Sequence, residues 1–228
     1  MTEADPLYND WIHQQLRVQP DSLAVFDLTS NRSFTWYQFN RRVDTLAARL
    51  LADGIQPGDR VAYLGLNSSD VVEIFFATVR IGAVYVPLNF RLTAADSTPV
   101  EPAAANADTL SMIMYSSGTT GKPKGVMYTR RMMLASALNL LQPSEASPES
   151  RVLNVMPLFH IGGMQFILMA VKFGIPHLMM RGFDPAAMLA AIDDAQLGIT
   201  NIGGVPAMWG AMSLMPNIDE IDLSRIRV

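Results

Sequence analysis

The sequence predicts an α/β fold in which helices flank layers of parallel strands. Short apolar runs alternate with helical segments along the chain, which is the order of β-α-β units. The apolar runs, such as residues 175–180, do not alternate apolar with polar side chains, which is typical of strands buried on both faces. The chain carries no repeat with a fixed period of about 20 to 50 residues, which excludes solenoids and propellers.

The first β-α-β unit lies in the N-terminal part of the chain. A helix is predicted to begin at Thr35, because Thr35 and Gln38 have the spacing of a capping box, and to end at Asp53 and Gly54. Its apolar residues recur at helical intervals: Phe39, Val43, Leu46 and Leu50. The following elements are a strand at 61–66, a helix that starts near Asn67, Ser68 or Ser69 and ends at Gly82, and a strand at 84–88.

A second series repeats the alternation of strands and helices. Its elements are a strand at 112–115, a glycine-rich loop, a helix from about Thr129, a strand at 152–155, a helix from about Gly163, a strand at 175–180, a helix opened by Pro185 and a strand at 199–202. This series carries the segments with candidate chemistry.

Residues 92–109 separate the two series and are rich in Ala, Pro, Asp and Ser, which predicts a linker or a disordered loop. The chain therefore divides into 1–91 with the first β-α-β part, the linker 92–109, and 110–228 with the glycine-rich loop. Residues 221–228 form a strand-like run with no turn or cap after it, so we expect an incomplete domain.

Composition excludes several classes of function. The 228 residues carry a formal charge of −4 and no basic block, so nucleic acid is not expected as the main partner. The chain has no cysteine, which excludes disulfides, thiolate catalysis and cysteine-bound metals. The N-terminus does not resemble a signal peptide, and the most apolar stretch, 161–171, is shorter than the roughly 20 residues of a membrane helix. We expect a cytoplasmic protein without a transmembrane segment.

The segment with the clearest chemistry is 115–125, YSSGTTGKPKG, which directly follows a predicted strand. Its glycines let backbone N–H groups approach a ligand, its hydroxyls can donate to oxygen atoms, and its lysines can balance the charge of a polyphosphate. It matches neither the Walker pattern, because Pro123 follows Lys122, nor the G-x-G-x-x-G fingerprint. Composition alone leaves a flexible loop of turn-forming residues as the alternative.

The order of these residues resembles the phosphate loop of the adenylate-forming superfamily, which includes acyl-CoA synthetases, the adenylation domains of peptide synthetases and firefly-type luciferases. The family pattern is close to Y-T-S-G-T-T-G-x-P-K-G, from which this chain departs only at Ser116. Further segments match in the expected order: FTWYQF at 34–39, IGAVYVPLN at 81–89, MPLFHIGG at 156–163 and GVPAMW at 204–209, which resembles the strand and turn of the acyl pocket.

The resemblance implies a two-step reaction. A carboxylate attacks the α-phosphate of ATP to give an acyl-adenylate and pyrophosphate, and a thiol such as that of coenzyme A then takes the acyl group. ATP, Mg²⁺ and coenzyme A are the implied cofactor and co-substrates, and a small carboxylic acid, fatty or otherwise, is the implied substrate. No metal-ligating residue of this chain is singled out.

The resemblance also assigns roles to single residues. The ATP phosphates would be held by Ser116, Ser117, Gly118, Thr119, Thr120, Gly121 and Lys124. Lys124 is the candidate catalytic cation, and His160 would lie beside the acyl group and the α-phosphate; the alternative for His160 is a packed histidine near a helix start. Gly203, Gly204 and Val205 would line the acyl pocket, with core packing as the alternative.

Compared with this family, the chain looks like an internally shortened N-terminal portion. The family normally continues with a further strand, helix and strand where this chain has residues 92–109, and it ends with a C-terminal domain that is absent here. We therefore expect little activity of the chain alone, and a polypeptide with the missing C-terminal half as a partner. Two alternatives stay open, namely a non-catalytic module that binds nucleotide or a partner, and an amino-acid adenylation domain.

Overall fold

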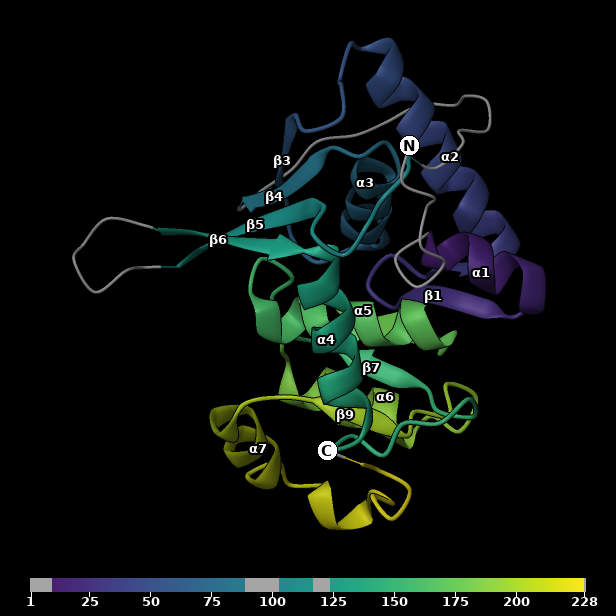
Figure 1. Cartoon of the computed structure of the whole chain (residues 1–228). Helices are drawn as coiled ribbons and strands as arrows, with labels where there is room; N and C mark the ends of the chain where they lie inside the picture. Colours follow the sequence, from purple (N-terminus) through teal and green to yellow (C-terminus); the bar gives the residue numbers. More distant parts are fainter. Residues whose placement is uncertain (1–9, 89–102, 117–123, 228) are drawn as a thin grey trace.

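Two β-sheets lie on either side of a layer of helices (Figure 1). The computed structural model describes residues 10–88, 103–116 and 124–227. Among these residues, α3 (Ser69–Arg80) packs against β3 (Arg60–Leu64) and β4 (Val84–Leu88) of one sheet and against β1 (Leu23–Asp27) of the other, so it lies between the sheets. The fold is therefore α/β, as the sequence predicts.

Neighbouring strands in the sheets include parallel pairs of the predicted β-α-β units, but not all neighbours are consecutive in the sequence. The four-stranded sheet has the order β3-β4-β5-β6, with the bounds Arg60–Leu64, Val84–Leu88, Leu110–Ser116 and Lys124–Thr129. The five-stranded sheet has the order β2-β1-β8-β7-β9, with the bounds Arg32–Thr35, Leu23–Asp27, His177–Met179, Val152–Asn154 and Asn201–Gly203. Within both sheets the central pairs are parallel, and the edge strands β2 and β6 pair antiparallel.

The helices fill the space between the sheets and cover one outer face. Their bounds are Trp11–Val18 (α1), Trp36–Ala52 (α2), Ser69–Arg80 (α3), Arg130–Leu141 (α4), Ile161–Phe173 (α5), Pro185–Asp193 (α6) and Pro206–Ser213 (α7). In the five-stranded sheet, Val152 belongs to the core shared with α2, α3 and α5, whereas its neighbour Leu153 packs with α6 and α7. Successive residues of a strand point to opposite faces, so this sheet is buried on both sides.

Burial on both faces holds for β7, β8 and β9 but not for β3. Val61 and Tyr63 are buried, whereas Arg60, Ala62 and Leu64 are exposed, so the expectation of two covered faces is wrong for this strand. The reason is its position, because β3 is an edge strand of the four-stranded sheet and only its helix-facing side is covered.

Helix α2 begins as predicted. The backbone N–H of Gln38 donates to the Thr35 hydroxyl, and the backbone N–H of Thr35 donates to the Gln38 side chain, which confirms the capping box. The helix ends at Ala52, and Gly54 follows with a φ of 90°, a conformation that glycine adopts without steric strain.

The structure differs from the sequence prediction in several places. Strand β6 was expected as part of the glycine-rich loop, α7 as a turn, and α1, β1 and β2 were not predicted. Helix α5 begins at Ile161, two residues before the expected Gly163. Part of the expected linker is structured, since the Ala103 N–H donates to the carbonyl of Arg80 and the Arg131 N–H donates to that of Ala107.

A buried ion-pair network joins three of the helices. The side chain of Arg80 at the end of α3 is fully buried and contacts Asp44 of α2 at 2.6 Å and Asp10 at the start of α1 at 2.5 Å. Arg80 also donates to the Asn40 side chain at 3.0 Å. Burial alone would raise the pKa of Asp10, but the Arg80 charge brings this pKa below its usual value. The network therefore orients α1, α2 and α3 relative to each other.

His177 in β8 is a buried histidine in the middle of the five-stranded sheet. Its Nε2 lies 3.4 Å from the Asn154 side-chain nitrogen, and its Nδ1 has no hydrogen-bond partner among the described residues. Burial lowers its pKa to about 3, so the ring is neutral near pH 7.

None of the helices in the described ranges is both long enough and apolar enough to cross a membrane.

His177 should make the stability of the protein depend on pH. Its pKa is about 6.5 in an unfolded chain, so the unfolded state binds the proton first as the pH falls. The stabilisation is complete above pH ~6.5 and decreases as the pH approaches the folded pKa of about 3. We expect wild type to lose about 2 kcal/mol more than His177→Leu between pH 7.5 and pH 5, measured by urea unfolding. Equal losses in wild type and His177→Leu would contradict this origin of the pH dependence. His160→Gln serves as the control, because it retains His177 and should show the same pH dependence as wild type.

Candidate functional site

The phosphate motif lies on a β-hairpin at the edge of the four-stranded sheet. Strands β5 and β6 pair antiparallel up to Ser116 and Lys124, which face each other as the last pair of the ladder. Lys124 is exposed at this end of the hairpin. Ser117, Gly118, Thr119, Thr120 and Gly121 lie outside the described residues. The hairpin therefore places the two described ends of the motif side by side, at the carboxyl end of β5.

His160 lies on the loop between β7 and α5. It is the N-cap residue of α5, and its carbonyl accepts hydrogen bonds from the N–H groups of Gly163 and Met164. Its side chain is exposed, with the ring centroid 4.6 Å from that of Phe159. The imidazole is therefore exposed at a helix start and could contact a ligand, while its ring also packs beside that of Phe159.

Asn154, at the end of β7, closes the loop that carries His160. Its side-chain nitrogen donates to the Gly163 carbonyl at 2.8 Å, and its side-chain oxygen accepts from the Met156 N–H at 3.0 Å. Gly163 lies so close to the start of the loop that a Cβ there would be 2.4 Å from the carbonyl oxygen of Pro157. The two ends of the 156–163 segment are thus held together by contacts to its backbone.

Gly203 is the last residue of β9, and Gly204 and Val205 connect this strand to α7. A Cβ on Gly203 would meet the Phe166 ring at 2.2 Å, and one on Gly204 would meet the Trp209 ring at 2.7 Å. These glycines allow two aromatic rings to pack directly on the backbone. Val205 is the N-cap residue of α7 and its side chain is 46% exposed.

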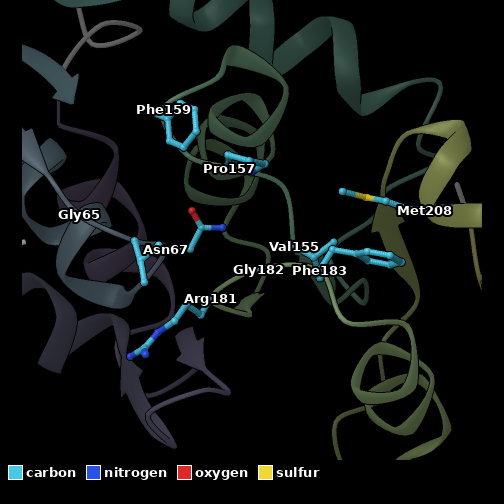
Figure 2. A pocket seen from close by; sticks show the side chains of 10 residues that line it. Gly65, Asn67, Val155, Pro157, Phe159, Arg181, Gly182, Phe183 and Met208 are labelled. Carbon is cyan, nitrogen blue, oxygen red and sulfur yellow. The ribbon is translucent and has the colours of Figure 1, made fainter. Parts of the chain in front are cut away.

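A pocket of about 190 Å³ opens beside these loops (Figure 2). The residues that line it come from the carboxyl ends of β3, β7 and β8 and from α7: Gly65, Leu66, Asn67, Val155, Pro157, Phe159, Arg181, Gly182, Phe183 and Met208. Most of the lining is apolar, and Figure 2 shows the Arg181 side chain directed away from Phe183 and Met208. The carboxyl ends of parallel strands are where open α/β sheets bind ligands. Gly203, Gly204 and Val205 are not in this lining, although Met208 follows them on α7.

The charged groups at these loops are mainly cationic. Lys124 and Arg181 are exposed, and Arg181 is held through its backbone N–H, which donates to the Thr29 hydroxyl. The described residues bring together no group of three or more His, Asp or Glu side chains of the kind that holds a metal ion. The arrangement is suited to an anionic ligand with an apolar part.

The model of the family described as AMP-binding enzyme matches two stretches, residues 12–98 and 94–228. The chain belongs to this family. Feruloyl-CoA synthase from Amycolatopsis sp is 32% identical over 260 positions, which cover 95% of this chain and 52% of that protein. The long-chain-fatty-acid–CoA ligase FadD13 of Mycobacterium tuberculosis is 27% identical, with 95% of this chain and 53% of that protein covered.

The fold of the AMP-binding enzymes is also visible in a solved structure. The N-terminal domain of FACL13 from Mycobacterium tuberculosis, an inhibitor-bound crystal structure, has a TM-score of 0.85 at 26% identity, with 95% of this chain and 67% of that chain covered. The chain spans about half the length of the curated relatives it matches.

These comparisons confirm the predicted family and show where this chain differs from its relatives. The alignment with feruloyl-CoA synthase is longer than the 228 residues of this chain, so the relative has residues inside the alignment that have no counterpart here. The family match is broken near residues 94–98, within the Ala- and Pro-rich segment. The chain is therefore a shortened N-terminal portion of an AMP-binding enzyme.

Sequence motifs identify only some of the side chains that shape the loops. Asn154 falls within the predicted strand 152–155, no motif includes Arg181 or Phe183, and Met208 lies in the 204–209 segment that resembles the strand and turn of the acyl pocket. Their common signal is position, since each lies at or just after the carboxyl end of a predicted strand, or at the start of the following helix. That signal points to one edge of a sheet but does not say which side chains meet there.

Gly163→Ala should disturb the loop that carries His160. The added methyl group would overlap a backbone carbonyl, so we expect a loss of about 2 kcal/mol or more in the free energy of unfolding, measured by urea denaturation. Gly162→Ala is the matched control, because its Cβ would meet only the Met156 side chain, at 3.8 Å. Similar losses in the two variants would contradict a close contact specific to Gly163.

Proposed function

We propose that this chain provides the ATP-binding and acyl-binding part of an AMP-forming acid–thiol ligase. In the first step, a carboxylate oxygen attacks the α-phosphorus of ATP, the bond to the β-phosphate oxygen breaks, and pyrophosphate leaves. In the second step, a thiol such as that of coenzyme A attacks the acyl carbon and AMP leaves. The observation that carries the proposal is the phosphate motif on the β5–β6 hairpin, at the carboxyl end of β5, together with the exposed His160 on the loop that follows β7.

Each part of the chain has a distinct task in this proposal. The segment from Ser116 to Lys124 offers N–H groups, hydroxyls and an ammonium to the β- and γ-phosphates, and these stabilise the charge that develops on the leaving pyrophosphate. His160 donates a hydrogen bond to the oxygen atoms at the reacting centre. Mg²⁺, which the family resemblance implies, would supply further positive charge at the phosphates.

The pocket supports a substrate with a compact apolar part. Apolar cavities of roughly 150 Å³ can hold one benzene ring, and this pocket has about 190 Å³. One relative is named for feruloyl-CoA and another for long-chain fatty acids, and these acids differ strongly in size. The volume and the apolar lining favour an aromatic or short carboxylic acid. An amino acid is disfavoured, because the lining has no carboxylate for its ammonium group.

The chain spans about half of its relatives, so the proposed reaction also needs the part of the enzyme that corresponds to their other half. A cytoplasmic location remains a prediction from the sequence. The alternative, a module that binds nucleotide without catalysis, predicts ATP binding by the chain but no reaction after a polypeptide with the other half is added.

ATP–pyrophosphate exchange tests the role of the hairpin. We expect exchange when this chain is mixed with a polypeptide that covers the remaining half of a relative, and at least a ~100-fold lower rate with Lys124→Ala, because a preorganised cation is lost. Arg131→Ala is the control, since it removes a cation at the start of α4 that pairs with Asp108. An unchanged rate with Lys124→Ala would remove Lys124 from the site, and ATP binding without exchange in the mixture would favour the module.

Met208→Trp tests the pocket. A larger side chain at this position fills part of the cavity, so we expect ferulic acid to bind about 10-fold more weakly or worse, measured by calorimetry. Leu214→Trp is the control just after the same helix, at a position that is 84% exposed. Palmitic acid that binds more tightly than ferulic acid to the wild-type chain would contradict the compact substrate.

A further inference from the structure

Asn67 connects the two sheets through its side chain. It lies in the loop that follows β3, a strand of the four-stranded sheet, and is only 6% exposed. Its side-chain nitrogen donates to the Met156 carbonyl at 2.9 Å and to the Met180 carbonyl at 3.3 Å, and its side-chain oxygen accepts from the Leu158 N–H at 3.0 Å. All three partners are backbone groups in loops of the five-stranded sheet.

The local sequence predicts a different role for Asn67. Asparagine before a helix commonly caps it, and Asn67 is one of three candidates for the start of α3. The N-cap residue is Ser68, which makes no side-chain capping bond, and the amide of Asn67 is directed across the molecule. A buried amide with both N–H groups and its oxygen in use is strongly fixed in orientation.

The partners of Asn67 lie in the loop that carries His160. Met156 and Leu158 are the residues whose backbone it holds, and His160 follows Leu158 by two positions. Asn154 holds the same segment at Met156 and Gly163. The position of His160 is thus determined by backbone contacts at both ends of its loop, of which those to Asn67 come from the other sheet.

The sheet that contains β3 also carries the β5–β6 hairpin with the phosphate motif, which we call the phosphate hairpin. Strands β3, β4, β5 and β6 are neighbours in one sheet, so Asn67 and the hairpin belong to one unit, whereas His160 and most of the pocket belong to the other. We propose that Asn67 is a positioning residue, which sets the location of His160 relative to the phosphate hairpin by tying the 156–158 segment to the four-stranded sheet. The catalytic part of this inference rests on the proposed function.

Pulsed electron spin resonance between two spin labels tests the geometry without any activity. The chain has no cysteine, so Met127→Cys on β6, which is 62% exposed, and Val205→Cys after β9 provide two unique labelling sites on the two sheets. We expect Asn67→Ala to broaden or shift the distance distribution. Asn201→Ala, which removes another buried amide that donates to the Ser144 carbonyl, should leave it unchanged. The same distribution in both variants would overturn the proposal.

Hydrogen exchange of the Leu158 amide provides a second, local measurement. With Asn67→Ala this N–H loses its acceptor, and we expect its exchange to become about 10-fold faster or more than in Asn201→Ala. Asn67→Asp keeps the acceptor for Leu158 and loses both donors, so it should retain much of this protection. If the alanine variant does not fold, Asn67→Asp replaces it in the spin-label measurement, where the loss of the bonds to Met156 and Met180 should shift the distance distribution. Equal exchange of Leu158 in Asn67→Ala and Asn201→Ala would contradict the contact.

The exchange reaction separates positioning from the proposed function. In the two-polypeptide mixture, Asn67→Ala should lower kcat at least 10-fold with little change in the KM for ATP, because the hairpin that binds the phosphates lies within the unaltered sheet. A normal kcat despite a shifted label distance would overturn the positioning role. If wild type shows no exchange, the proposed function fails, while the label distances still decide whether Asn67 sets the geometry.

Discussion

The groups assigned to the site lie on loops of two different sheets, and the relative position of these sheets is the constraint on which the site depends. The phosphate hairpin continues β5 of the four-stranded sheet, whereas His160 follows β7 of the other sheet. Misplacing reacting groups by about 1 Å can cost a large part of a catalytic effect. A fold that divides its site between two sheets needs directional contacts, which fix the orientation of the sheets relative to each other, as well as contacts that stabilise their association.

The two kinds of contact are provided by different residues. Apolar side chains from both sheets and from α2, α3 and α5 form one core, and their burial stabilises the association without strong directional preference. Directional bonds come from a few buried polar groups. Arg80 orients α1, α2 and α3 through Asp10 and Asp44, and Asn67 ties a loop of one sheet to the other.

The shortened connection of this chain falls between β4 and β5, at the centre of the four-stranded sheet. In the register of this pair, Tyr85 faces Met112, and β5 is held much more extensively by β6 on its other side. Residues after the connection attach to the helix layer, since the Ala103 N–H donates to the Arg80 carbonyl. The hairpin that carries the phosphate motif therefore depends on β5–β6 pairing for its shape and on the contact between β4 and β5 for its place in the sheet.

The sequence by itself determined the α/β class, the capping box of α2, the order of most strands and helices, and the family through the phosphate motif. These features depend on local patterns, namely the period of apolar residues, capping spacing and an ordered motif. Strand β6 was missed because its Val126–Tyr128 run follows glycines and a proline that locally indicate a loop. Only the tertiary structure decided that the Asn67 side chain connects the two sheets and that Met208 and Phe159 line one pocket. Asn67 and Leu158 are 91 positions apart, so no local pattern contains their contact; it exists only once the core has brought the two sheets together.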